Sequence, residues 1–542
     1  MSRFVRSPLF LGLGLLLAVM VATLSQAASP VHAATLNVDQ ADAACNDVTG
    51  TPYCTIGAAV ADANAGDTIN VFPGTYPESV DLSTMATPGD ITLTTVNASG
   101  TPTPSTVTVS PAAGEAFQAG CTFPGSITID GFTVLSLDDD GIDLCADGDI
   151  TIKNVTANGN SSDGVDAGGS GNLTITDSTA NDNGDNGFDN DVDGDVAVSG
   201  SSADNNEDEG FVIDGFESDA AGDVTITGSS ANGSQSDDGF EIDAASVAVS
   251  NSTANDNDDE GFDIVSSGAV TLDRVTAIGN VEDGIDVEGA SEEEGTSVGN
   301  VTIRNSLTTN NEEDGIEYLE PGTLAGATQL ANGNIICGND VGIELNENIT
   351  VNAEGNWWGA ATGPFDAVDN PAGTGDDVSD STGGAAGTVD FTPWIDTVSG
   401  SGSAIVGQAS TISFEFKGGA GAVAFAEGPG DTTGAPTFTS ATSNGTATTS
   451  GFVSGGKLNV SLTAATVGTA NVTVTGPCGI TGSFAVAVAA APVAPTPTVV
   501  QLPRTGGAPA NGGALPWLAA LAGALALTSG GLALAYRTRR IR

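Results

Sequence analysis

Histidine and basic residues are nearly absent from this sequence of 542 residues. It contains one histidine, His32, and only 12 lysines and arginines against 69 aspartates and glutamates. The formal net charge of -57 repels phosphate groups, so we expect no nucleic-acid partner. If His32 is removed with the N-terminal segment, the remaining chain has no histidine. That excludes Ser-His and Cys-His nucleophile pairs and histidine metal sites.

The N-terminus carries a short apolar run. Arg3 and Arg6 precede it, it extends over residues 9–24, and small residues flank His32. This order of a basic, an apolar and a small-residue region predicts a secretory signal peptide over residues 1–33. An uncleaved membrane anchor is the alternative, but the run is short for a bilayer span of about 20 residues.

The C-terminus has three parts: a five-residue motif, an apolar stretch over residues 514–536 and the basic tail 537–542. The motif is Leu502, Pro503, Arg504, Thr505 and Gly506. The order of the parts resembles the LPXTG-type sorting signal of surface proteins that a sortase anchors. The resemblance implies that a sortase-type transpeptidase cuts between Thr505 and Gly506 and joins the threonine to the cell envelope.

Without a sortase, the apolar stretch is long enough for a transmembrane helix, and the arginines after it hold the tail in the cytoplasm. In both cases most of the chain faces outward. We therefore expect a secreted protein that is anchored to the cell wall or cell surface.

A block of about 23 residues recurs through the middle of the chain. Each copy contains an acidic residue or asparagine, a glycine, an apolar residue and usually a second acid, as in Asp140-Gly141-Ile142-Asp143. A second block alternates apolar and polar residues, as in Ile150-Thr151-Ile152. Short alternating runs between Gly, Asn, Asp and Ser predict strands and turns, and the period predicts a parallel β-helix with one coil per repeat.

The residues before the repeats predict a cap on the first coil. The apolar residues Ile56, Ala59, Val60 and Ala63 fall on one helical face, Thr55 can cap its start, and residues 66–76 read as a strand that ends in a Pro-Gly turn. A short helix followed by such a strand resembles the entry into right-handed parallel β-helix proteins of the pectate lyase type.

Aromatic residues mark the expected end of the solenoid. The sequence around Trp357 and Trp358 resembles a closing motif of extracellular β-helix proteins, and Phe391 to Trp394 resembles the strand that follows it. We interpret the cluster as a cap over the last coil. A sugar-stacking platform is the alternative. The stretch from Asp366 to Gly387 is expected to be a loop.

These features predict an all-β protein: a right-handed parallel β-helix solenoid, then a small immunoglobulin-like β-sandwich and a C-terminal transmembrane helix. The sandwich prediction comes from regular short strands such as residues 411–416. The expected divisions are the signal peptide 1–33, the cap and first coils 34–125, the repeats with a C-terminal cap 126–395, the sandwich 396–490, a Pro/Thr/Val stalk 491–501 and the sorting signal 502–542.

Like positions of neighbouring coils lie about 4.8 Å apart and form ladders along a solenoid. We interpret two such ladders as structural: an interior stack of phenylalanines and a set of buried amides that can bond to the turn backbone and to one another. The first comprises Phe188, Phe211, Phe240 and Phe262, and the second comprises Asn158, Asn181, Asn232, Asn255 and Asn310.

Disulfides suit an exported chain with six cysteines. Cys121 and Cys145 lie about one coil apart, so they can meet across neighbouring coils. Cys45 and Cys54 flank a short loop and form the other expected pair. The pairing of Cys337 and Cys478 stays open.

The acids are concentrated in the repeats, whereas residues 397–490 are nearly neutral. Carboxylates stacked at about 5 Å repel one another by roughly 3–4 kcal/mol at an effective dielectric of about 20, so a ladder of them needs cations or full solvation. Calcium is the cofactor we consider, and a merely solvated acidic face is the alternative. In either case the motif glycine is expected to make the turn, the apolar residue to fill the core and the acids to face outward.

The candidate calcium ligands are the acids of the repeated motif and of the segment from Asp189 to Gly194. That segment resembles the first half of a calcium loop, although Gly200 stands where such a loop has its glutamate. The candidates are Asp140, Asp143, Asp163, Asp166, Asp189, Asp191, Asp193, Asp238, Glu241, Asp263, Asp283 and Asp286.

Paired carboxylates such as Asp140 with Asp143 can serve as acid and base in catalysis. A pair that recurs in nearly every coil, however, does not mark a single catalytic site. Pectate lyases use calcium and an arginine base, and the repeats offer only Arg274 and Arg304. We therefore identify no catalytic residue and favour an adhesin or structural stalk that contacts polysaccharide or a host or neighbouring cell surface. An extracellular polysaccharide lyase or glycoside hydrolase is the alternative.

Overall fold

The computed structural model describes residues 33–103, 106–214, 222–289, 299–318, 329–346, 349–379, 388–419, 423–425, 437–453 and 456–492. The sorting signal, the expected transmembrane helix, most of the stalk and all but the last residue of the expected signal peptide lie outside these ranges. Within them, no helix combines the length and apolar character that crossing a membrane requires.

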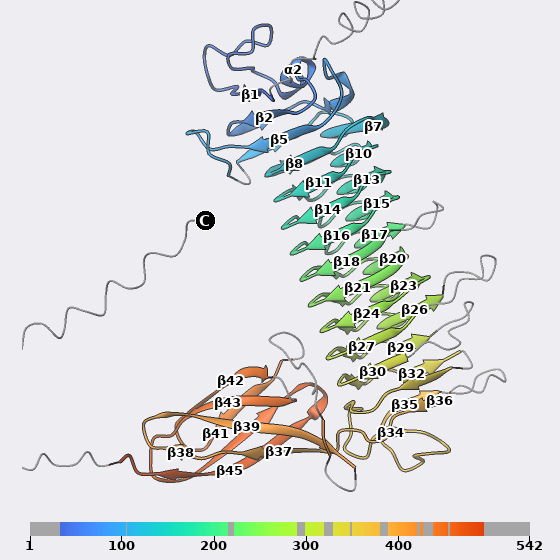
Figure 1. The fold of residues 1–542 in the computed structure, drawn as a ribbon, viewed down its shortest axis with the longest axis vertical. Coiled ribbons are helices and arrows are strands. Elements are labelled where there is room, and N and C mark those ends of the chain that lie inside the picture. Colours follow the sequence, from blue (N-terminus) through green and yellow to red (C-terminus); the bar gives the residue numbers. More distant parts are fainter. Residues whose placement is uncertain are drawn as a thin grey trace, which may run out of the picture. The chain divides into compact units, whose positions relative to one another are not determined.

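Short parallel strands stack into a solenoid with three sheets (Figure 1). Among the described residues the first sheet has 14 strands, in the order β1 (Thr35–Val38), β2 (Asp67–Val71), β5 (Ile91–Thr95), β8 (Ile127–Asp130), β11 (Ile150–Lys153), β14 (Leu173–Thr176), β16 (Val196–Ser199), β18 (Asp223–Thr227), β21 (Ser246–Ser250), β24 (Val270–Asp273), β27 (Val301–Arg304), β30 (Gln329–Asn332), β33 (Thr350–Asn352) and β36 (Thr388–Asp390).

The second sheet has 13 strands in the same ranges, in the order β4 (Val80–Asp81), β7 (Phe117–Phe123), β10 (Ile142–Ala146), β13 (Val165–Gly169), β15 (Phe188–Val192), β17 (Phe211–Asp214), β20 (Phe240–Ala244), β23 (Phe262–Ser266), β26 (Ile285–Gly289), β29 (Asp314–Tyr318), β32 (Val341–Leu345), β35 (Gly375–Ser379) and β34 (Pro364–Phe365). The third sheet consists of β3 (Gly74–Tyr76), β6 (Val107–Val109), β9 (Phe132–Val134), β12 (Thr156–Ala157), β19 (Ser230–Asn232), β22 (Thr253–Asn255), β25 (Thr276–Ile278), β28 (Leu307–Thr309) and β31 (Ile335–Cys337). Single β-bridges at Thr179 and Ser202 connect β12 to β19.

The alternation of apolar and polar residues sets the register of each strand. In β10 the side chains alternate between buried and half-buried, with Ile142 and Leu144 inside. Ile142 lies opposite Val165, and Val165 lies opposite Phe188, so equivalent residues of each coil stack directly. A shift by one residue would turn the apolar set outward, which is why the pattern specifies one register. The predicted parallel strands and one coil per repeat are confirmed.

The predicted phenylalanine stack forms one column of the core. The rings of Phe188, Phe211, Phe240 and Phe262 are fully buried. Their centroids follow one another at 4.8, 4.9 and 5.0 Å, and adjacent rings are within 10° of parallel. The spacing equals the distance between strands, so the coil repeat itself brings the rings into contact.

The amide ladder exists for Asn158, Asn181, Asn232 and Asn255, but its predicted member Asn310 is exposed and lies one residue past the equivalent position, which Thr309 occupies. A second and deeper ladder lies two residues further along each turn. The amides of the predicted ladder are half-buried where they pair, as in the 2.9 Å bond from Asn181 N to Asn158 Oδ1. The deeper ladder buries its amides almost completely: Asn183 Oδ1 accepts from both the N and the Nδ2 of Asn160, at 2.9 and 3.0 Å. This ladder comprises Asn160, Asn183, Asn206, Asn257, Asn280, Asn311 and Asn339.

The motif glycine is required for close packing, not for the turn that we predicted from it. A Cβ atom on Gly261 would lie 2.6 Å from Asn280 Nδ2 and 2.7 Å from the carbonyl oxygen of Gly284 in the next coil. Both distances are shorter than a carbon atom tolerates, and the backbone of Gly261 does not adopt a positive φ. Glycine at this position therefore lets each buried amide lie against the neighbouring coil.

The N-terminal end of the solenoid is covered as predicted. Helix α2 (Ile56–Asp62) lies at the blue end in Figure 1, and its buried face includes Ile56, Ala59 and Val60. The Thr55 side chain accepts a 3.3 Å hydrogen bond from Ala58 N at the start of the helix. The 3-10 turn η1 (Leu82–Thr84) follows β4. Because the helix covers the apolar end, the first coil is not left open.

At the other end, Trp358 is fully buried in the solenoid core, in agreement with a cap. The predicted loop from Asp366 to Gly387 is wrong in part, because residues 375–379 form β35, which pairs with β32. Val378 supplies its buried side chain. A single apolar residue among glycines and aspartates gives no alternation from which a strand could be recognised.

Residues 397–489 form two further sheets. The first contains β37 (Thr397–Ser401), β39 (Ala409–Gly418), β43 (Lys457–Thr463), β42 (Thr446–Val453) and β40 (Val423–Ala424). The second contains β38 (Ala404–Ile405), β45 (Thr481–Ala489), β44 (Gly468–Thr475) and β41 (Thr439–Thr442), and η2 (Pro477–Gly479) precedes β45. Phe414, Val460 and Val472 belong to one buried cluster that both sheets share. The immunoglobulin-like assignment stays a prediction.

Three disulfides join the six cysteines. Cys45 pairs with Cys54, and Cys121 pairs with Cys145 across neighbouring coils, as expected. The pairing that the sequence left open joins Cys337 at the end of β31 to Cys478 in η2. The indole Nε1 of Trp357 donates a 3.1 Å hydrogen bond to the carbonyl oxygen of Cys478.

Candidate functional site: the acidic face of the second sheet

Acidic side chains form columns along the second sheet. The second residue of most strands is acidic and points to the same side, opposite the core. We call this surface, together with the acids of the turn that precedes each strand, the acidic face. Its strand column, in register from coil to coil, comprises Asp143, Asp166, Asp189, Glu241, Asp263, Asp286, Glu317 and Glu344, with Val212 interrupting it after Asp189.

The first acid of each motif is part of the backbone hydrogen-bond network. Asp140 Oδ1 accepts a 3.0 Å bond from Asp163 N, and Asp163 Oδ1 accepts a 2.8 Å bond from Asn186 N in the next coil. The same bond recurs from Glu260 N to Asp238 Oδ1. Asn186 Oδ1 accepts the equivalent bond from Glu209 N, because this position requires only an acceptor oxygen.

The expectation that these acids face outward is wrong for several of them. Asp163, Asp238, Asp283 and Asp286 are only 8, 4, 3 and 3% exposed. The turns of neighbouring coils stack within hydrogen-bond distance, so each turn covers the acid of the coil beside it. A simple solvated surface therefore does not describe this part of the face.

The calcium-loop resemblance of Asp189 to Gly194 is also wrong. Residues 188–192 form β15, in which Asn190 is fully buried and donates a 2.9 Å bond to the carbonyl oxygen of Val212. Side chains of a strand alternate, so Asp189 and Asp191 lie on one face while Asn190 points to the other. A loop that wraps its oxygens around one ion cannot form from this segment.

Carboxyl groups of adjacent coils are in hydrogen-bond contact with one another. The pairs are Asp185–Asp208, Glu209–Asp237, Asp238–Glu260, Asp259–Glu282, Asp283–Glu317 and Asp314–Glu344. Two ionised carboxylates cannot share a hydrogen bond, so a pair with a buried member, such as Asp238–Glu260, needs a proton or a cation between its oxygens.

The pKa values of the acids reflect this crowding. Burial first, and then the charges of neighbouring acids, raise the pKa of Asp163 to about 8 and that of Asp166 to about 7. The same causes raise the pKa of Asp263 to about 8. For the Asp238–Glu260 pair, burial raises the pKa of both carboxyls, and their contact raises the pKa of Asp238 further while it lowers that of Glu260.

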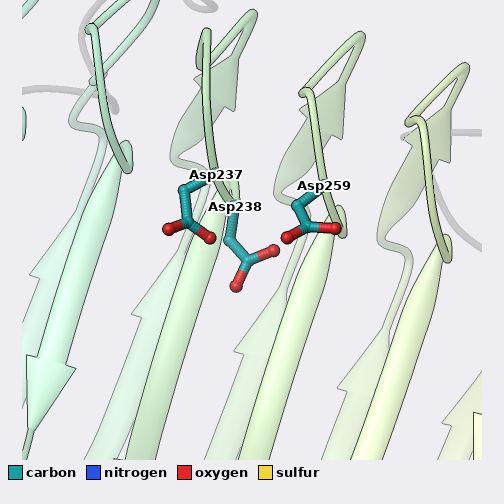
Figure 2. Close-up of side chains that lie close together, drawn as sticks. All are labelled: Asp237, Asp238 and Asp259. Carbon is teal, nitrogen blue, oxygen red and sulfur yellow. The ribbon is translucent and has the colours of Figure 1, made fainter.

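Among the described residues, three groups of acids come close enough to hold a metal ion. In each group, one oxygen from every member lies within 4.8 Å of the others. Figure 2 shows the first, in which Asp237 and Asp238 of one coil approach Asp259 of the next. The other two are Asp259, Glu260 and Glu282, and Asp283, Asp314 and Glu317.

Of the twelve sequence-predicted ligands, only Asp238 and Asp283 belong to these groups. Six of the others belong to the strand column: Asp143, Asp166, Asp189, Glu241, Asp263 and Asp286. Asp140 and Asp163 lie in the turns before the strands, and Asp191 and Asp193 are exposed. Six other members were not among the predicted ligands. Asp237, Asp259 and Glu282 directly precede the motif, Glu260 and Asp314 are its first residue, and Glu317 is its second acid, so they could have been found by aligning every copy.

A comparison with protein-family models finds a match in the region of the repeats. Residues 119–268 and 213–334 match the family model for right-handed β-helix regions. The match agrees with the parallel strands described above. Comparison with curated proteins gives no match.

Solved structures with a similar fold are distant. A rhamnogalacturonan lyase is 11% identical, with a TM-score of 0.26, over 66% of this chain and 86% of that chain. The periplasmic alginate epimerase AlgG is 11% identical, with a TM-score of 0.23, over 60% and 76%. The enzymatically active domain of bacteriophage CBA120 tailspike protein 2 is 11% identical, with a TM-score of 0.29, over 80% and 67%. Likenesses at this level say nothing about the function of the present chain.

The two arginines of the solenoid do not belong to the acidic face. Arg274 Nη2 lies 3.0 Å from Asp273 Oδ2, and Arg304 Nε lies 3.4 Å from Asp273 Oδ1. Asp273 and Arg304 end strands β24 and β27 of the first sheet. The described strands of the second sheet contain no lysine, arginine or histidine. The acidic face therefore has no basic side chain of its own strands to act as a base or to neutralise its charge.

Proposed function

We propose that the protein is displayed on the cell envelope as a β-helix surface protein with a structural or adhesive role. The recurrence of the acidic pair in successive coils carries this proposal, because multivalent binding or structural support uses many equal positions, whereas catalysis uses one. The ion pairing of Arg274 and Arg304 with Asp273 on another sheet supports it. A polysaccharide surface or a host or neighbouring cell surface is the partner we propose.

Envelope attachment is proposed from the sorting-signal resemblance at residues 502–506. Replacing Thr505 with alanine removes the residue at which a sortase would form its bond. We expect the wild-type chain in the cell-wall fraction and the T505A chain in the membrane fraction. Immunoblots of fractionated cells measure this, and Thr498→Ala in the stalk is the matched control. Equal wall attachment of both variants would exclude sorting at Thr505.

A polysaccharide lyase or hydrolase is the second candidate. One observation favours it: the pKa of Asp163 is raised to about 8, mainly by burial, which keeps a carboxyl protonated near neutral pH as a general acid must be.

Incubating the purified exported chain with a panel of acidic polysaccharides, with and without calcium, separates the two candidates. We expect retention of the protein on one or more immobilised polysaccharides, with no release of unsaturated or reducing ends. Release of such ends that D163N abolishes, while the exposed-site control D147N retains it, would instead establish the enzyme.

A further inference from the structure

The acids Asp283, Asp314 and Glu317 come together from two adjacent coils. Asp283 precedes β26, and Asp314 and Glu317 lie in β29. One oxygen of each lies within 4.8 Å of the others. Asp283 and Asp314 are only 3 and 6% exposed, so two of the three carboxyls are withdrawn from water.

Hydrogen bonds fix the carboxyls in this arrangement. Asp314 N donates to Asp283 Oδ1, which orients the Asp283 carboxyl. Asn346 Nδ2 donates to Glu317 Oε1 from the next coil. The ion pairs between described residues involve the acids Asp130, Asp273 and Glu415, and none of these three. The group is therefore positioned but not neutralised by a basic side chain.

A fourth carboxyl beside the group lacks a partner. Asp286 is 3% exposed, and its Oδ1 has no hydrogen-bond partner among the described residues. It lies directly opposite Glu317 in the register of β26 and β29, so both side chains point to the same face. A buried acceptor without a donor indicates that a cation completes the arrangement.

The chemistry of the donors indicates which cation fits. All four groups offer carboxylate oxygen, without nitrogen or sulfur, and hard oxygen sets suit calcium or magnesium. Calcium binds oxygen at about 2.3–2.6 Å, so two oxygens on one ion lie at most about 5 Å apart. The spacing within the group meets that limit before any rearrangement. Calcium accepts flexible coordination, whereas magnesium demands a near-ideal octahedron, so we test calcium.

We propose that Asp283, Asp314 and Glu317 bind one calcium ion, with the Asp286 carboxyl as the fourth anionic group of the site. The ion would link the two adjacent coils that contain β26 and β29, and it would supply the positive charge that this part of the acidic face lacks. This inference does not depend on whether the surface role is adhesive or enzymatic.

Calcium titration of the full exported chain by isothermal calorimetry, after treatment with a chelator, tests the site. The double variant Asp314→Asn with Glu317→Gln keeps the shape of both side chains and removes two charges. We expect it to bind one calcium fewer per chain than the wild type. The matched control is Asp166→Asn with Asp189→Asn, which removes two charges from the strand column elsewhere and should keep the wild-type stoichiometry.

A single variant covers the case in which the double variant does not fold. Asp286→Asn is expected to weaken calcium binding at this site about 10- to 100-fold, as removal of a supporting group does at metal sites. Circular dichroism establishes that each variant is folded. The proposal is overturned if the wild type binds no calcium at millimolar concentration, or if folded D286N and the double variant both bind as the wild type does.

Discussion

Replacing Phe240 with alanine is expected to lower the free energy of unfolding of the β-helix by about 3–5 kcal/mol. The ring is fully buried between Phe211 and Phe262, with centroid distances of 4.9 and 5.0 Å. Removing it takes away contacts on both faces and leaves a cavity that the stacked coils cannot close, because their backbones are fixed by the sheet hydrogen bonds. Urea unfolding followed by circular dichroism measures the change.

Phe240→Leu is the matched control. The same core position holds Ile142, Val165 and Ile285 in other coils, so an aliphatic side chain fits the backbone. We expect the leucine variant to lose clearly less stability than the alanine variant, because it keeps most of the buried volume. Equal losses would show that ring stacking, and not filled volume, stabilises this column. A loss below about 1 kcal/mol for alanine would contradict its place in the core.

The sequence was sufficient for the solenoid because two periodicities agree. Alternation within each strand decides which residues face inward, and the coil repeat decides which residues stack. Phe188, Phe211, Phe240 and Phe262 satisfy both, so their column could be predicted before the structure was known. The disulfide between Cys121 and Cys145 followed from the same coil spacing.

The turns could not be predicted in the same way. Asn158 and Asn160 flank Gly159, whose φ of +72° breaks the strand alternation. Which of the two amides points inward depends on that turn, and Asn160 is the one that is 4% exposed. The recurrence of asparagine at 183, 206, 257, 280, 311 and 339 was the available signal. It was missed because the half-buried ladder of Asn158 has a similar spacing.

The depth of the acids was missed for a related reason. Charged residues next to a glycine normally indicate a solvated turn, and the sequence does not show that the next coil covers that turn. Asp283 and Asp314 come together only because the coils stack across a gap of 31 residues, which includes an insertion. A fixed period of about 23 residues misses this pair, although both acids open a copy of the repeated motif and an alignment of the copies brings them together.

Raising the pH from 5 to 8 without divalent cations is expected to lower the free energy of unfolding of the β-helix by at least about 2 kcal/mol. Asp163 has a pKa of about 8 in the folded chain, raised chiefly by burial, against the ordinary aspartate pKa of 3.8. Between these values the folded state holds a proton that the unfolded state has released. Folding is therefore favoured at low pH, and this contribution is lost as the pH rises through about 8. Each such carboxyl changes the stability by up to about 1.4 kcal/mol per pH unit.

Urea unfolding at pH 5 and pH 8 in the presence of a chelator measures this dependence, and Asp163→Asn separates the buried acid from the total charge. Asparagine at position 163 keeps the acceptor oxygen for the backbone N–H of Asn186. Asparagine already occupies the equivalent position 186 of the next coil, so the variant should fold. Its loss of stability between the two pH values should be smaller than that of the wild type. Asp147→Asn removes the same charge from an exposed position and should leave the wild-type pH dependence of stability unchanged.

If both variants flatten the pH dependence equally, general repulsion among the acids is responsible, and burial of Asp163 is not. If the wild type is more stable at pH 8, the acidic face is ionised and solvated throughout, because only a folded state that binds the extra protons loses stability as they leave.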